Sequence, residues 1–168
     1  MTIDLKKIKK IYFIGIKGVA MSGLAVICKE KGMEVVGSDV PEKFITDKIL
    51  QKKNIRVFDD FSAANLDFNP DLVVLGASWS ENNIEFEEVK KRKINFLTDS
   101  EMRGVLSREK ETIAVAGVHG KTTTTSMIAY LFKQSGLNPS FLIGTGIVFD
   151  LGTNAAWNNL GRLLIFSI

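Results

Sequence analysis

Residues 112–126 read TIAVAGVHGKTTTTS, an apolar run followed by a glycine-containing loop and a Gly-Lys-Thr triplet. The run 112–117 predicts a buried strand, and residues 121–135 predict a helix. In such strand–loop–helix units, backbone N–H groups and the helix N-terminus hold the phosphates of a nucleoside triphosphate. The stretch therefore predicts the start of a P-loop ATPase-type α/β domain that uses ATP and Mg²⁺.

Each residue type in the loop suits this chemistry. The predicted cofactor-binding residues are Gly117, Val118, His119, Gly120, Lys121, Thr122 and Thr123. We expect Lys121 and Thr122 to be catalytic, because the ammonium meets the outer phosphates and the hydroxyl ligates magnesium. The stricter pattern G-x-x-x-x-G-K-[ST] needs glycine where Val115 stands, so the loop is a shortened variant. His119 either contacts substrate or phosphate, or is simply a polar loop residue.

The rest of the chain alternates short apolar runs with amphipathic stretches, which predicts a parallel sheet covered on both faces. Expected strands cover 10–16, 33–39, 55–58, 71–78 and 140–144, and expected helices cover 18–32 and 42–53, with further helices beginning at Asn82 and Thr98. The segment 107–111 is polar and lacks periodicity. We therefore expect a Rossmann-like domain over residues 1–107 and an incomplete ATP-binding domain over residues 108–168.

A second, weaker phosphate motif follows the first expected strand. The dinucleotide fingerprint G-x-G-x-x-G is met here by Gly15, Lys17 and Ala20, so only the first glycine is kept. Lys17 offers a charge to a diphosphate in place of a close backbone approach. Asp39, at the end of the next strand, is placed to accept a hydrogen bond from a ribose or a base. The alternatives are a tight turn with no ligand and a nicotinamide-dependent dehydrogenase.

Composition excludes several classes of protein. The net charge is +3, from 22 basic and 19 acidic residues in mixed clusters, so nucleic-acid binding is not indicated. One cysteine and one histidine exclude an internal disulfide and a Cys/His zinc cluster, and Cys28 is expected in the core. No apolar run approaches the roughly 18 residues that span a bilayer, so no membrane role is expected and the cytoplasm is the predicted location. No oligomeric state is indicated.

Several stretches together resemble the Mur ligases of peptidoglycan synthesis. They are YFIGIKGVAMSGLA (12–25), VVGSD (35–39), IAVAGVHGKTTTTSMIA (113–129), GLNPSFLIG (136–144) and GTNA (152–155). The histidine in GVHGKTTTTS favours the alanine-adding member and the muropeptide-recycling ligase. The family usually has glycine at the positions of Lys17 and Ala20 and threonine at Val118. The first two departures bear on contact with the UDP-sugar.

The resemblance implies a reaction and a set of substrate contacts. ATP would phosphorylate the carboxylate of UDP-N-acetylmuramic acid, and the amine of L-alanine would attack the acyl phosphate to form an amide. The implied substrate-binding residues are Gly15, Lys17, Gly18, Val19, Ala20, Met21, Ser22, Asp39, Ser78, Thr153 and Asn154.

The resemblance also implies a longer chain. Members of the family carry acidic magnesium ligands on a following strand, whereas no Asp or Glu follows Asp150 here and residues 162–168 are an apolar tail. We therefore expect a truncated and inactive fragment that retains UDP-sugar binding. A muropeptide-recycling ligase and a non-catalytic nucleotide-sugar-binding protein remain alternatives.

Overall fold

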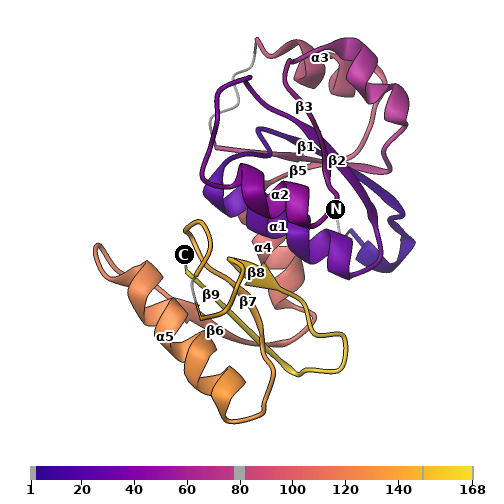
Figure 1. Ribbon diagram of the computed structural model, residues 1–168. Helices are drawn as coiled ribbons and strands as arrows, with labels where there is room; N and C mark the ends of the chain where they lie inside the picture. Colours follow the sequence, from indigo (N-terminus) through magenta and orange to yellow (C-terminus); the bar gives the residue numbers. More distant parts are fainter. Residues whose placement is uncertain (1–2, 78–81, 149, 168) are drawn as a thin grey trace.

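The computed structural model describes residues 3–77, 82–148 and 150–167, and these form two sheets, each with its own helices (Figure 1). The first sheet has the order β3-β2-β1-β4-β5, and every neighbouring pair is parallel. Its strands are β1 (Lys10–Ile14), β2 (Glu34–Ser38), β3 (Arg56–Phe58), β4 (Leu72–Leu75) and β5 (Phe96–Thr98). The predicted Rossmann-like parallel sheet is confirmed.

Helices cover both faces of this sheet because its central strands are apolar on both sides. Ile11 and Phe13 of β1 pack with α1, α2 and α4, whereas Tyr12 and Ile14 pack with α3 and η2. These elements are η1 (Leu5–Lys7), α1 (Val19–Glu30), α2 (Asp47–Lys52), η2 (Ala63–Phe68), α3 (Ile84–Lys91) and α4 (Asp99–Ser107). Cys28 is fully buried in α1, where burial raises its thiol pKa to about 12, as expected for a core residue.

The two predicted helix starts have different outcomes. The start at Thr98 is confirmed: its hydroxyl accepts from the Glu101 N–H at 3.3 Å, and the Glu101 carboxylate accepts from the Thr98 N–H at 2.8 Å. The start at Asn82 is wrong by one residue. Asn83 caps α3, accepting from the Glu85 N–H at 2.9 Å. The shift turns the Glu85 side chain away from the cap and into the protein interior.

The second sheet has the order β6-β9-β7-β8 and is covered by α5. Its elements are β6 (Glu111–Val115), α5 (Lys121–Gln134), β7 (Ser140–Leu142), β8 (Ala155–Ala156) and β9 (Leu163–Ser167). The strand predicted at 112–117 forms as β6, but its predicted burial is wrong, because β6 is an edge strand with exposed or half-buried residues throughout. Leu163–Ser167, within the predicted apolar tail, instead form the interior strand β9, which pairs in parallel with β6 and β7.

A glycine in β2 permits the close approach of β1. A Cβ atom built at Gly37 would lie 2.5 Å from the Phe13 carbonyl oxygen and 2.7 Å from Ile16 Cδ1. We expect Gly37→Ala to lower the free energy of unfolding by about 1–3 kcal/mol or more, measured by urea denaturation. Gly104→Ala is the matched control: nothing lies within 4 Å of its built Cβ, and alanine favours a helix, so a gain of up to about 1 kcal/mol is expected. Equal effects of the two changes would contradict this packing.

Candidate functional site

The predicted phosphate loop joins β6 to α5 and curls at two glycines. Gly117 has φ 155° and Gly120 has φ 76°, and Gly120 is the left-handed N-cap of α5. A side chain at position 120 would strain this turn. The Lys121 ammonium lies 2.7 Å from the Gly117 carbonyl oxygen, so it folds back across the loop. The first amides of α5, with no side-chain cap, and this ammonium are therefore gathered at one helix N-terminus.

The other loop residues lie at the surface of this turn. Val118 is 87% exposed, and His119 and Thr123 are also exposed. The Thr122 hydroxyl lies 3.5 Å from the Gly144 carbonyl oxygen, at the outer limit of a hydrogen bond, and so remains available to a ligand. Across the described ranges, no group of three or more His, Cys, Asp or Glu side chains could hold a metal ion.

The weaker motif forms the turn between β1 and α1. Gly15 has φ 81°, and Gly18 is the N-cap of α1 without a side-chain cap. Val19 and Ala20 lie half-buried in the first turn of α1, whose amides are directed to the carboxyl edge of the first sheet. The Met21 and Ser22 side chains are 3% and 0% exposed, and the predicted contacts of these two residues with the substrate stay a prediction. Ser78 lies outside the described residues.

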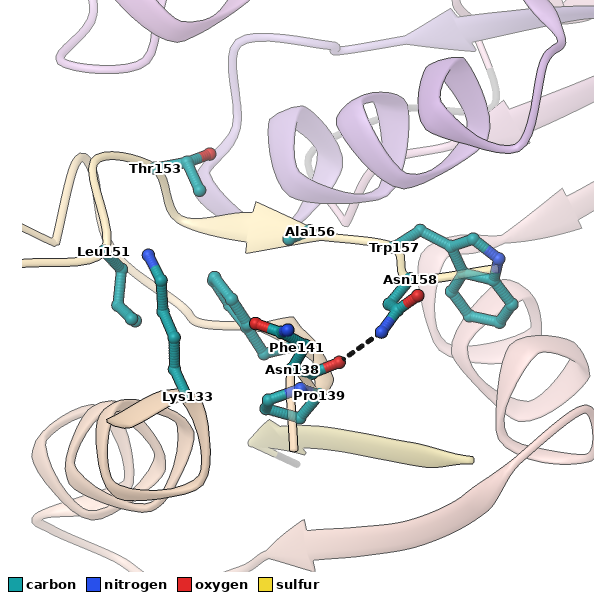
Figure 2. A pocket seen from close by; sticks show the side chains of 9 residues that line it. All are labelled: Lys133, Asn138, Pro139, Phe141, Leu151, Thr153, Ala156, Trp157 and Asn158. Atoms are coloured by element: carbon teal, nitrogen blue, oxygen red, sulfur yellow. Dashed lines mark hydrogen bonds between the residues drawn. The ribbon is translucent and has the colours of Figure 1, made fainter. Parts of the chain in front are cut away.

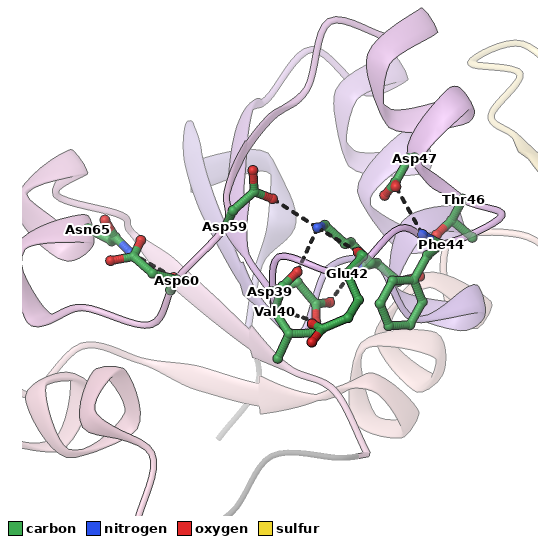
Figure 3. Close-up of polar contacts among 10 residues, drawn as sticks. Asp39, Val40, Glu42, Phe44, Thr46, Asp47, Asp59, Asp60 and Asn65 are labelled. Carbon is green, nitrogen blue, oxygen red and sulfur yellow. Dashed lines mark hydrogen bonds and ion pairs between the residues drawn. The ribbon is translucent and has the colours of Figure 1, made fainter.

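Lys17 and Asp39 are both engaged within the protein (Figure 3). The Lys17 ammonium donates to the Val40 and Glu42 carbonyl oxygens at 2.7 and 3.1 Å and to Asp59 Oδ1 at 2.9 Å. Asp39 accepts from the Lys17 N–H at 2.7 Å and from the Val40 N–H at 2.8 Å, and it is only 8% exposed. In this structure, therefore, Lys17 does not offer its charge to a diphosphate and Asp39 is not open to a ribose.

Asn154 links the α1 N-terminus to the second sheet. Its fully buried amide nitrogen donates to Thr145 O at 3.1 Å, Ser22 Oγ at 3.3 Å and Val19 O at 3.4 Å. Two of these partners are carbonyls, which only accept, so the orientation of the amide is fixed. The Asn154 Oδ1 atom is buried and has no partner among the described residues, so it can accept from a water or a ligand. The Thr153 hydroxyl donates to Ala155 O at 3.0 Å.

Sequence reasoning missed a contact that joins the two sheets at the other end of α1. The Trp157 ring lies beneath two ammonium groups, with Lys31 at 4.0 Å and Lys110 at 4.4 Å from its centroid. The backbone N–H of Trp157 also donates to Glu30 Oε2 at 2.6 Å. Burial lowers the pKa of Lys110. No local pattern marks these residues, because they are brought together only by tertiary packing. They fix α1 against β8 and thereby place the two predicted loops on one body.

A cavity of about 390 Å³ lies away from the phosphate loop (Figure 2). Its lining residues are Lys133, Asn138, Pro139, Phe141, Leu151, Thr153, Ala156, Trp157 and Asn158. Lys133 is near the C-terminus of α5, whereas the loop is at its N-terminus, and a helix of 14 residues is about 20 Å long. Of the predicted site residues only Thr153 borders it, so the cavity is separate from the ATP loop.

Comparison with known proteins agrees with this architecture. The Mur ligase family, described as its catalytic domain, matches residues 10–111. UDP-N-acetylmuramate--L-alanine ligases from Dictyoglomus turgidum and Aquifex aeolicus are each 42% identical, over 157 and 160 residues. These alignments cover 94% and 95% of this chain but 33% and 34% of the relatives, so the chain spans about a third of their length.

Solved structures give the same result. The UDP-N-acetylmuramate-alanine ligase of Thermotoga maritima superposes with a TM-score of 0.84 at 32% identity, covering 95% of this chain and 36% of that one. The UDP-N-acetylmuramate:L-alanyl-gamma-D-glutamyl-meso-diaminopimelate ligase of Neisseria meningitides also gives 0.84, at 31% identity, covering 95% and 52%. On its sequence match and its fold, this chain belongs to the Mur ligase family.

Proposed function

We propose that this chain supplies the UDP-sugar site and the ATP loop of a ligase that joins L-alanine to UDP-N-acetylmuramic acid in peptidoglycan synthesis. The observation that carries the proposal is the curled loop at the start of α5, where the uncapped amides after Gly120 and the Lys121 ammonium lie at one helix N-terminus. The names of the relatives supply the substrates. Because the chain spans a third of those relatives, turnover belongs to the longer protein.

The two units have different roles in this proposal. Residues 1–107 would bind the UDP-sugar, with the diphosphate held by the backbone amides of Val19 and Ala20 at the uncapped start of α1. The Gly15 N–H already donates to the Ser38 carbonyl oxygen at 2.9 Å. Residues 108–168 would begin the ATP-binding domain, which includes the loop. Thr153, Asn154 and Ser78 stay further predicted contacts of the substrate.

The chemistry would take place at the phosphate loop. The substrate carboxylate attacks the γ-phosphorus of ATP and releases ADP, and the alanine amine then displaces phosphate from the acyl phosphate to form the amide. Lys121 would neutralise charge on the transferred phosphoryl group, and the amides around Gly120 would orient it. The Thr122 hydroxyl would hold magnesium, which supplies further positive charge to the phosphates when bound. His119 is exposed nearby, open to either substrate or phosphate.

Calorimetry on the 168-residue chain tests the proposal. UDP-N-acetylmuramate is expected to bind with one-to-one stoichiometry and a Kd of about 10 μM or tighter, with UDP competing and NADH giving no heat. No ATP turnover is expected from the chain alone. Alanine-dependent phosphate release by this chain would contradict the assignment of turnover to the longer protein. A complete lack of UDP-N-acetylmuramate binding would contradict the proposal that this compound is the substrate.

A muropeptide-recycling ligase is the second candidate, because the Neisseria and Thermotoga structures superpose equally well. An assay comparing L-alanine with the tripeptide as the amine, in a chimera described below, separates the two. A dehydrogenase is disfavoured by the internal engagement of Asp39, and NADH fluorescence would test it. Nucleotide-sugar binding by a full-length chimera that lacks turnover would favour a non-catalytic binder. Among the described helices, none has the length and hydropathy of a bilayer span, and a cytoplasmic location remains our proposal.

A further inference from the structure

The segment 40–46, here called the arch, connects β2 to α2. A helix was expected over 42–53, but α2 begins only at Asp47, and residues 40–45 are exposed and non-helical. Val40, Phe44 and Ile45 of the arch are 37%, 40% and 67% exposed. A surface segment with so little burial is expected to open locally unless hydrogen bonds hold it.

Lys17 supplies those hydrogen bonds from three of its groups. Its N–H donates to Asp39 just before the arch, and its carbonyl oxygen accepts from the Thr46 hydroxyl at the end of the arch. Its ammonium donates to the carbonyl oxygens of Val40 and Glu42 within the arch (Figure 3). The first two bonds use only the backbone and are open to any residue except proline at position 17, so the bonds to the arch carbonyls are the ones that depend on the lysine side chain.

The burial of the ammonium shows what this side chain is used for. The Lys17 side chain is 5% exposed, and a buried ammonium is costly unless all three of its donors find acceptors. Two carbonyls of the arch and Asp59 satisfy them. Asp59 is 67% exposed, so the ion pair itself contributes little. The ammonium therefore serves chiefly to fix the backbone of the arch.

The arch lies between the two phosphate motifs. It follows β2 at the carboxyl edge of the first sheet, beside the β1–α1 turn that contains Lys17, and ligands of such sheets bind at that edge. Its Ile45 contacts the loop after β7: a Cβ built at Gly146 would be 3.1 Å from Ile45 Cδ1. The same loop includes Gly144, whose carbonyl oxygen is 3.5 Å from the Thr122 hydroxyl. The arch thus borders the first motif and contacts the loop beside the second.

We propose that Lys17 is a positioning residue for the nucleoside diphosphate-sugar, which holds the arch in its binding conformation before the ligand arrives. This inference rests on the proposed function. It assigns Lys17 a role that the fingerprint glycine could not perform. A pre-formed arch lowers the ordering cost of binding, so loss of the ammonium should weaken binding without removing a direct ligand contact.

Hydrogen exchange on the unliganded chain tests whether Lys17 holds the arch in place. In Lys17→Met the Val40 and Phe44 amides, which are hydrogen bonded to Asp39 and Asp47, are expected to exchange about ten-fold faster than in the parent, while those of β1 are unchanged. Lys43→Met, which removes an exposed ammonium from the same arch, is the control and should leave exchange unchanged. Unchanged exchange of these arch amides in Lys17→Met would overturn the inference, whether or not the chain binds UDP.

Calorimetry with UDP at several ionic strengths tests whether the pre-formed arch strengthens ligand binding without a direct contact from the ammonium. Lys17→Met is expected to bind UDP about ten-fold more weakly, with the same salt dependence as the parent. A smaller salt dependence would mean that the ammonium contacts phosphate directly, which would overturn a positioning role. Asp59→Asn, at an exposed position, guards against a folding defect and should weaken binding less than about three-fold. If the parent itself does not bind UDP, the proposed function fails. The exchange result still decides whether Lys17 holds the arch.

Discussion

Replacing Lys121 by alanine is expected to lower alanine-dependent phosphate release by about 10²- to 10³-fold. The Lys121 ammonium lies 2.7 Å from the Gly117 carbonyl and has a short path to a phosphate held by the loop. Phosphoryl transfer depends mainly on positioning and charge neutralisation, so loss of this cation removes stabilisation from the transition state. Turnover is measured in a chimera in which this chain replaces the matching third of the Aquifex aeolicus ligase.

Lys133→Ala is the matched control for this change. Lys133 belongs to the same helix, near its other end, and the substitution removes the same charge from an exposed position. The control chimera is expected to keep its rate within about two-fold, since surface charges far from a site are screened by salt. A Lys121→Ala chimera that retains most of its rate would show that the loop does not hold the transferred phosphate.

Replacing Glu85 by alanine is expected to lower the free energy of unfolding by about 3–5 kcal/mol. The carboxylate is fully buried and accepts from Tyr12 Oη at 2.8 Å, Asn65 Nδ2 at 2.9 Å and the Ser62 N–H at 3.2 Å, and also from the Ser38 hydroxyl. Alanine would leave these donors without an acceptor. Urea denaturation followed by circular dichroism measures the loss.

Glu85→Gln is the matched variant, because the amide oxygen can keep three of these bonds while the Ser38 hydroxyl reverses to accept. A loss below about 1.5 kcal/mol is expected. Burial raises the pKa of Glu85 above its ordinary 4.5, against the lowering effect of its hydrogen bonds. The folded protein therefore binds this proton more tightly than the unfolded chain does. The stability that comes from this proton uptake is complete below that value and is lost as the pH rises through the raised pKa.

The pH dependence separates Glu85 from the other carboxyl groups. From about pH 4 upward, the parent should lose stability relative to Glu85→Gln, because only the parent carries this titrating group. Exposed carboxyl groups with lowered pKa values, such as Asp71 and Glu101, are common to both proteins and cancel in the difference. A difference that is flat with pH, or that grows in favour of the parent, would contradict the raised pKa.

Local patterns predicted much of the fold. The alternation of apolar runs and amphipathic stretches identified the parallel sheet, and Thr98 with Glu101 identified one helix start. Local patterns failed where the tertiary position decides burial. The run 112–117 is apolar like a buried strand, yet β6 lies at a sheet edge, and residues Leu163–Ser167 of the tail supply the interior strand beside it. Strand order is set by packing, which periodicity does not report.

In the candidate site, too, the sequence predicted the local features but not the contacts made between distant parts of the chain. The curl at Gly117 and Gly120 follows from local glycine chemistry and was predicted. The bonds from the Lys17 ammonium to Val40 and Glu42 depend on an arch more than 20 residues away, and those from Asn154 reach Ser22 across 132 residues. Such contacts have no signature in a single sequence, because the acceptors are either backbone carbonyls, which every residue has, or polar side chains far away in the chain.

The most direct test of the phosphate loop is an NMR titration of the ¹⁵N-labelled chain with MgATP. The largest amide shifts are expected at Gly120, Lys121 and Thr122, because their N–H groups surround the proposed phosphate position at the start of α5. Lys121→Ala should abolish them. Saturating MgATP that leaves these three amides unmoved, or that shifts only the amides of the β1–α1 turn, would contradict the assignment of the loop.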